Sequence, residues 1–393
     1  MPHARSWGSA GAAALAAASV LIGTVSASEP ASDIELRLIG EHHIEPRAEF
    51  LGTRIGGLSG IDYEPNWGFM IALSDDKGEH APPRAYLAEI ELAPDRIVGL
   101  EWMNVLKMHW GSGELIDVAL DPEGIRFVPH GEKFGEPTLL FVSEGDARRG
   151  VEPRIYEMCS GATRMDEWPA PRSHVPTGRR SRVGVHDNRA FESVAVVGDR
   201  RAVVGTERPL RQDGGRYVRL STYDLREPLA DAVSQVAYPL GAPGAALASP
   251  AVGLVDLLAL EGGRLLAVER SLRLTGGYSV ELYIIDPAGA TDVLDAPTLD
   301  DGGFTPARKT PVASLSDLAP TVLNVEGVCF GPRLADGTAT LLFVSDSNFA
   351  PGLPTVLTAL AIEDDGGVLR PVTIEFAHGR PAGPAGRPEH AGS

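Results

Sequence analysis

Acidic side chains recur at two fixed places in five similar stretches of this sequence. The first place, at the start of an apolar run, holds Ser59, Glu123, Glu192, Asp256 and Glu326. The second place, at the end of the following apolar run, holds Asp75, Glu144, Glu207, Glu269 and Asp346. Clustered carboxylate oxygens suit a hard cation such as calcium, and a carboxylate can also transfer a proton in hydrolysis. The spacing therefore predicts a metal-assisted hydrolytic site.

We predict different roles for the two sets of acidic residues. The predicted catalytic carboxylates are Glu123, Glu192 and Glu326. The predicted calcium ligands are Asp75, Glu144, Glu207, Asp256, Glu269 and Asp346. Carboxylates held close together need compensation, either from a bound cation or from arginine. A strand-end carboxylate can instead cap a turn, but turn capping does not favour glutamate, so it explains the whole set less well.

Arginine is the main basic residue near these positions, because the chain has only four lysines. Its guanidinium fork matches the oxygens of a phosphate group in pairs. The predicted substrate-binding residues are Arg84, Arg154, Arg208 and Arg270. We therefore expect a small-molecule substrate that carries a phosphate ester.

The acidic places are carried by one repeating succession of apolar runs. The last copy, residues 326–362, reads EGVCFGP, then LLFVSDSN, then VLTALAI, and the five copies begin at residues 59, 123, 192, 256 and 326. Turn residues separate the runs and no strong helical period is present, so the runs are expected to be strands. The start of one hairpin strand lies beside the end of the next, so both acidic places should share one rim.

Radial repetition of such units predicts an all-β fold, a β-propeller with five repeats and five or six blades. The strand that closes the last blade is either residues 34–44 or residues 368–377. If both segments are used, an extra partial blade becomes possible. A pair of β-sandwiches is the alternative architecture, but it does not explain five similar units.

The two ends of the chain have their own composition. Residues 1–27 are predicted to be a signal peptide, because Arg5 precedes a short apolar run and Val25-Ser26-Ala27 has the small-residue pattern of a cleavage site. The alternative is an uncleaved anchor. Residues 28–377 are expected to form a single propeller domain, and the Gly/Pro/Arg-rich residues 378–393 a disordered tail. The protein is thus expected to be exported, either periplasmic or secreted.

The formal net charge of the chain is -18. A charge of this sign repels nucleic acid and anionic membranes and attracts cations. Neither a Gly-x-Ser-x-Gly motif nor zinc-type histidine spacing is present, so an ordinary serine hydrolase and a zinc enzyme are not supported. No run after the first is long and apolar enough to cross a membrane. We expect a monomer, and Cys159 and Cys329 either pair or stay free.

Three segments of the sequence resemble the phytase-like family, also called "esterase-like activity of phytase". They are NRAFESVAVVGDRRAVVGTERPLRQDG, VDLLALEGGRLLAVERSL and NVEGVCFGPRLADGTATLLFVSDSNF, and DPEGIRF is similar to an earlier repeat of the family. The resemblance covers roughly residues 50 to 365 and implies an exported propeller with phosphoesterase or esterase activity. The family's acidic motifs fall on Glu123, Glu192, Glu207, Glu269, Glu326 and Asp346. One departure is Ser193, where the family usually has glycine after the glutamate.

Three functions remain open at this point. The first is calcium-assisted hydrolysis of a phosphate ester, in which the cation polarises the phosphoryl oxygens and a carboxylate of the rim accepts the proton. The second is a non-catalytic propeller of the cell envelope that binds a ligand or a protein. The third is hydrolysis of a carboxylic ester or a lactone. Propellers carry many functions, so the fold does not choose among them.

Overall fold

The structure is a computed structural model that describes residues 34–109, 112, 114, 116, 120–128, 138–146, 151–159, 165–176, 181–198, 200–242, 252–273 and 276–372. Contacts divide the chain into two units, Met1–Pro30 and Ala31–Ser393, and every described residue belongs to the second unit. The predicted signal peptide (1–27) and the predicted tail (378–393) lie outside the described residues.

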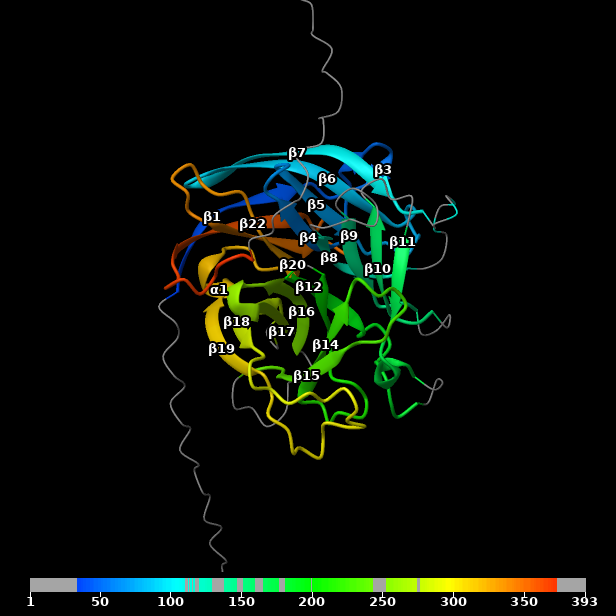
Figure 1. The fold of residues 1–393 in the computed structure, drawn as a ribbon. Coiled ribbons are helices and arrows are strands. Elements are labelled where there is room, and N and C mark those ends of the chain that lie inside the picture. The colour runs from blue at the N-terminus through cyan, green and yellow to red at the C-terminus, as the bar shows by residue number, and fades with distance from the viewer. Residues whose placement is uncertain are drawn as a thin grey trace, which may run out of the picture. The chain divides into compact units, whose positions relative to one another are not determined.

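Five antiparallel sheets of four strands form the blades of a propeller (Figure 1). Blade 1 consists of β4 (Leu58–Glu64), β5 (Phe69–Ser74), β6 (Arg84–Ala93) and β7 (Arg96–Lys107). Blade 2 consists of β8 (Pro122–Val128), β9 (Thr138–Ser143), β10 (Arg154–Cys159) and β11 (Met165–Pro169). Blade 3 consists of β12 (Phe191–Val197), β13 (Arg201–Thr206), β14 (Tyr217–Asp224) and β15 (Ser234–Pro239).

Blades 4 and 5 complete the ring. Blade 4 consists of β16 (Val252–Ala259), β17 (Leu265–Leu272), β18 (Tyr278–Asp286) and β19 (Arg308–Ser314). Blade 5 consists of β20 (Asn324–Phe330), β21 (Thr340–Asp346), β22 (Thr355–Asp364) and β1 (Glu35–Ile44). Outside the blades lie β2 (Glu49–Phe50), β3 (Thr53–Arg54), η1 (Arg172–His174), η2 (Glu261–Gly263) and α1 (Leu315–Leu318). The prediction of an all-β propeller is confirmed, with five blades.

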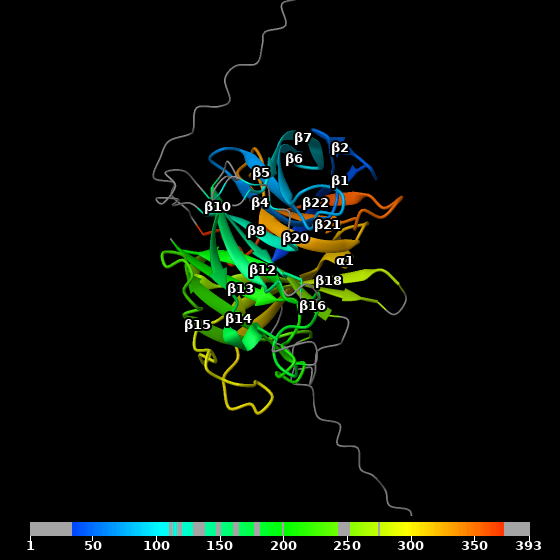
Figure 2. The ribbon, with the colours of Figure 1, turned by 90° about the vertical axis from the view of Figure 1, so that its right-hand side faces the viewer.

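The first strand of each blade lies next to the first strand of the following blade. Contacts run from β4 to β8, β12, β16 and β20 in turn, and β20 contacts β4, so the ring is closed (Figure 2). The N-terminal strand completes the last blade, because β1 pairs with β22 as the outer strand of blade 5. Of the competing segment 368–377, only residues 368–372 are described, and Pro371 bridges Leu260 of blade 4 instead. Because the five sheets form a closed ring, the alternative of a pair of β-sandwiches is wrong.

The hydrophobic core lies between the blades. Each of five large apolar clusters joins two neighbouring blades, for example Phe191 and Tyr223 of blade 3 with Trp168 of blade 2. Strand β9 is buried at every position, as its continuous apolar sequence requires. Cys329 on β20 is a buried free thiol, so it does not pair with Cys159, which is buried on β10. Among the described residues, no helix is long and apolar enough to cross a membrane.

Candidate metal and substrate site

A β-bulge interrupts the first strand of every blade, at the first acidic place in blades 1, 2, 3 and 5 and one residue before it in blade 4. In β12, for example, Phe191 pairs with Thr206 and Ser193 with Gly205, so Glu192 is the extra residue. A bulge re-aims the local side chains, and in blades 2, 3 and 5 the re-aimed residue is a glutamate. The bulge positions of the five blades are Ser59, Glu123, Glu192, Val255 and Glu326.

The ends of the second strands lie opposite these bulges. In each blade, the residue just before the bulge pairs with a residue of the second strand. From blade 1 to blade 5, these second-strand partners are Ser74, Ser143, Thr206, Glu269 and Ser345. The residues that follow them are Asp75, Glu144, Glu207, Arg270 and Asp346. Blade 4 therefore contributes Val255 and Arg270, where blades 2, 3 and 5 carry two carboxylates and blade 1 carries Ser59 and Asp75. The sequence alignment of blade 4 is shifted by one residue in both strands.

Asp256 follows the bulge, at the place where blades 1, 2 and 5 have glycine. It is fully buried and forms an ion pair of 2.7 Å with Arg126 of β8. Its second oxygen accepts a hydrogen bond of 2.8 Å from Val328 N, and Arg126 donates to the carbonyls of Ile61 and Leu257. The ion pair thus connects the first strands of blades 1, 2, 4 and 5 by hydrogen bonds. Asp256 is held in this pair and does not join the other predicted metal ligands.

Glu269 is directed between blades 3 and 4. Its carboxylate accepts hydrogen bonds from Lys309 Nζ at 2.5 Å and Tyr238 Oη at 2.5 Å. Lys309 and Glu269 are almost completely buried. Their packing explains why this predicted metal ligand is also held apart from the other carboxylates.

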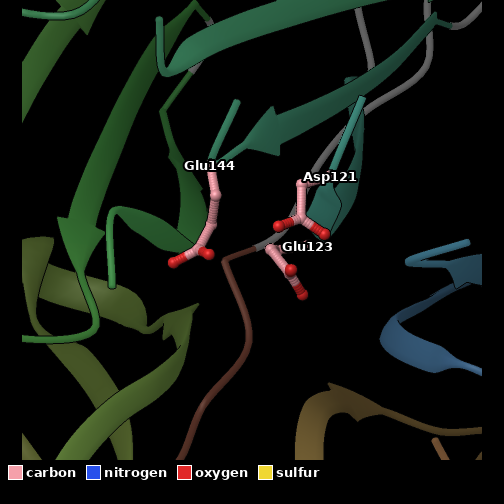
Figure 3. Close-up of side chains that lie close together, drawn as sticks. All are labelled: Asp121, Glu123 and Glu144. Atoms are coloured by element: carbon pink, nitrogen blue, oxygen red, sulfur yellow. The ribbon is translucent and has the colours of Figure 1, made fainter. Parts of the chain in front are cut away.

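The remaining acids gather on blades 1, 2, 3 and 5. Asp121, Glu123 and Glu144 form a group that we call the trio, in which one oxygen of each lies within 4.8 Å of the others (Figure 3). Glu144, Glu192 and Glu207 satisfy the same distance limit. All five side chains are buried. Glu144 belongs to both groups, so the carboxylates form one continuous arc.

Burial and mutual repulsion raise the pKa values across this arc. The pKa of Glu144 is raised to about 8, mainly by burial and then by the charge of Asp121. Burial, with Glu192 as the strongest charged neighbour, raises the pKa of Glu123 well above its usual range. The pKa of Glu192 is raised well above its usual range by burial and by Glu144 and Glu207. Such groups favour a proton or a metal ion as partner.

Blades 1 and 5 extend the acidic surface. Burial and the neighbouring Asp346 raise the pKa of Asp75 well above its usual range. Burial raises the pKa of Glu326 to about 7, although Arg270 opposes this, and it raises the pKa of Asp346 to about 6. Gly57 has φ +58, and a Cβ there would lie 2.0 Å from Asp75 Oδ1. Glycine is therefore required for Asp75 to reach its position.

One carboxylate oxygen of the trio has no protein partner. Glu144 Oε1 accepts a hydrogen bond of 2.5 Å from Ala190 N, whereas Oε2 is buried without a hydrogen bond. Glu144 is only 5% exposed. A buried oxygen without a donor is costly, and a hard cation that prefers oxygen ligands would satisfy it. The residues of the trio therefore fit calcium.

Three basic side chains border the rim. Lys77 forms an ion pair with Asp121, and Arg189 Nη1 donates to both oxygens of Glu207 at 2.6 Å. Arg270 pairs with Glu326 and lies 3.6 Å from Glu207. Sequence reasoning missed Lys77, Asp121 and Arg189 as site residues. The available signal was their position, since each lies within three residues of an acidic place.

The four predicted substrate-binding arginines have different surroundings. Arg84 is fully buried and pairs with Asp76 at 2.7 Å. Arg154 pairs with the more exposed acids Glu152 and Glu167. Arg208 donates to the carbonyl of Val252 and follows Glu207 directly. Of the four, Arg208 and Arg270 therefore lie beside the acidic arc, whereas Arg84 is held by a structural ion pair.

Ser193 fits the crowded rim because the facing strand has no side chain there. The Ser193 hydroxyl donates to the carbonyl of Gly205 at 3.3 Å. A Cβ on Gly205 would lie 2.7 Å from Ser193 Oγ. The departure from glycine in β12 is thus compensated within the same blade.

Comparison with known proteins identifies a family. A family model described as "Phytase-like: Esterase-like activity of phytase" matches residues 53–349. A search of curated proteins gave no match. Among solved structures, an exo-beta-1,3-galactanase from Phanerochaete chrysosporium is 12% identical with a TM-score of 0.46, over 84% of this chain and 66% of that chain. An alpha-L-arabinofuranosidase from Podospora anserina is 10% identical with a TM-score of 0.42, over 84% and 98%.

Proposed function

Because the chain belongs to the phytase-like family, we propose that it is an exported hydrolase that cleaves a phosphate ester with a calcium ion held at the channel rim. The observation that carries the proposal is the buried and unpartnered Glu144 Oε2 within the trio. Export follows from the leader-like residues 1–27, so the protein would act in the periplasm or outside the cell.

The charge of the rim supports a bound cation. Its acids are Asp75, Asp121, Glu123, Glu144, Glu192, Glu207, Glu326 and Asp346. The basic residues for which ion pairs with these acids are described are Lys77, Arg189 and Arg270. If all were ionised, these eight acids would exceed the three bases by five charges. Either protons or a divalent cation must offset that excess, and the trio offers oxygens alone.

The trio would hold the cation, which when bound polarises phosphoryl oxygens and lowers the pKa of a water ligand. Arg189 and Arg270 lie on the opposite side of the acidic arc, where their guanidinium groups would bind the phosphoryl oxygens and stabilise charge that develops on them. Glu192 lies between the two sides, next to Glu144 and Glu207. In its ionised form, this carboxylate would accept a proton from the attacking water.

A panel of chromogenic phosphate and carboxylate esters tests the proposal, with calcium and with a chelator. We expect calcium-dependent release from phosphate esters alone. Glu192→Gln should lower kcat about 10²-fold or more while calcium still binds, whereas Glu144→Gln should abolish calcium binding. The exposed Glu89→Gln is the matched control and should be unchanged.

Two results would contradict the proposal. Calcium binding without hydrolysis of any ester would favour a non-catalytic binding propeller. Cleavage of carboxylic esters or lactones in the presence of chelator would assign a different hydrolysis to the rim.

A further inference from the structure

Lys77 covers the outer side of the trio. Its Nζ forms an ion pair with Asp121 Oδ2 and also donates to Asn188 Oδ1 at 2.9 Å. The Lys77 side chain is 33% exposed, whereas that of Asp121 is 4% exposed. Lys77 is therefore the more exposed member of this ion pair.

The contacts of Lys77 span three successive blades. Lys77 follows β5 of blade 1, Asp121 precedes β8 of blade 2, and Asn188 precedes β12 of blade 3. Asn188 has a positive φ of 54° in the turn that is closed by the bridge between His186 and Arg189. The same turn carries Arg189, which pairs with Glu207. One short segment thus places an amide acceptor for Lys77 beside a guanidinium of the rim.

The Lys77 ammonium and a divalent cation compete for the same carboxylate. A cation in the trio needs an oxygen of Asp121, and like charges at this separation repel. Lysine is a compact charge on a flexible stem, so it can move by a few ångströms without disturbing the backbone. The amide oxygen of Asn188 carries no charge and would keep its hydrogen bond to the displaced ammonium.

We infer that Lys77 exchanges partners: its ammonium neutralises Asp121 until a divalent cation enters the trio, and it then binds the anionic oxygens of the substrate. The inference rests on the proposed function and adds the regulation of that site. Cation binding would release a positive charge next to Arg189, on the side where the phosphoryl group is expected. The anion site would therefore be complete only when the cation is present.

Isothermal titration of purified Lys77→Gln tests the exchange, with Lys107→Gln as the matched control because Lys107 is exposed at the end of β7. Calcium is titrated first, and inorganic phosphate is then titrated at saturating calcium. For Lys77→Gln we expect calcium to bind at least fivefold more tightly and phosphate at least fivefold more weakly. A merely structural role of Lys77 would weaken both ligands together. Lys107→Gln should match the wild type.

The outcomes separate this inference from the proposed function. If the wild type binds calcium and Lys77→Gln binds it with the same Kd, the exchange is refuted while the metal site stands. If calcium binds more tightly to the variant but phosphate binding is unchanged, the transfer of Lys77 to the substrate is refuted. If the wild type binds no calcium, the proposed function itself fails. Far-ultraviolet circular dichroism and the Tm of both variants establish that they are folded.

Discussion

Replacing Glu144 by glutamine should stabilise the protein in the presence of a chelator. Glutamine keeps the acceptor for Ala190 N but cannot ionise. A pKa of about 8 against the ordinary value of 4.5 corresponds to about 5 kcal/mol between the protonation states. Because the folded-state pKa is the higher one, wild-type stability is greatest below pH 4.5 and is lost as the pH rises through about 8. Glu144→Gln lacks this loss.

The expected gain follows from these two pKa values. Without metal, Glu144→Gln should exceed the wild type by about 3 kcal/mol at pH 7 and about 5 kcal/mol at pH 9, and should equal it near pH 4. Calcium at a hundredfold excess over Kd stabilises the wild type by about 2.7 kcal/mol, so the difference should almost vanish at pH 7 and fall to about 2 kcal/mol at pH 9. Urea denaturation at several pH values, with chelator or calcium, measures both effects.

A second substitution of the same type provides the contrast. Glu269→Gln should destabilise the protein by about 3–5 kcal/mol, because Lys309 would stay buried without its carboxylate. The sequence alignment gives Glu144 and Glu269 the same place, so only their surroundings distinguish them. If Glu144→Gln in chelator is no more stable than the wild type at pH 9, the repulsion described for the acidic arc is refuted.

Three further predictions concern other parts of the chain. Arg126→Met should lower the free energy of unfolding, measured by urea denaturation, by about 3–5 kcal/mol, because it leaves Asp256 buried without its charge partner. The double variant with Asp256→Leu should recover much of this stability. An equal loss in both variants would contradict the role of the pair. Arg189→Gln should raise KM for a phosphate ester about tenfold and change calcium affinity little, and a loss of calcium binding instead would assign Arg189 to the metal side. Mass spectrometry of the exported protein should find the N-terminus near Ser28, and an intact Met1 on cytoplasmic protein would refute export.

The repeat pattern was sufficient to predict the ring of blades. Five apolar triplets with turn residues between them specify five hairpin-based sheets, and β-strand pairing then places both acidic places at one end. The closing strand was left open because residues 34–44 and 368–377 have similar apolar patterns. Only the pairing of β1 with β22 decides between them.

The sequence alignment of the acidic places matches the bulge register in blades 1, 2, 3 and 5 and is shifted by one residue in blade 4. In blade 4, Asp256 lies one residue after the bulge residue Val255, and Glu269 lies one residue before Arg270, which occupies the second acidic place. The sequence gives no sign of where a bulge falls. Each residue step turns a side chain to the other face of a strand, so Arg270 points where a carboxylate was expected. Lys77, Asp121 and Arg189 lie in connections next to blades 1, 2 and 3, respectively. The spacing of residues within one repeat does not predict an ion pair between two blades, such as that of Lys77 with Asp121.

Locating calcium in a crystal is the most direct test of the central claim, which is that the trio holds a metal ion. After a calcium soak, anomalous diffraction should show one ion about 2.3–2.6 Å from oxygens of Asp121, Glu123 and Glu144, including Glu144 Oε2. The Lys77 ammonium should then lie away from Asp121. A trio without an ion at saturating calcium, or an ion held elsewhere with the trio unchanged, would contradict the account.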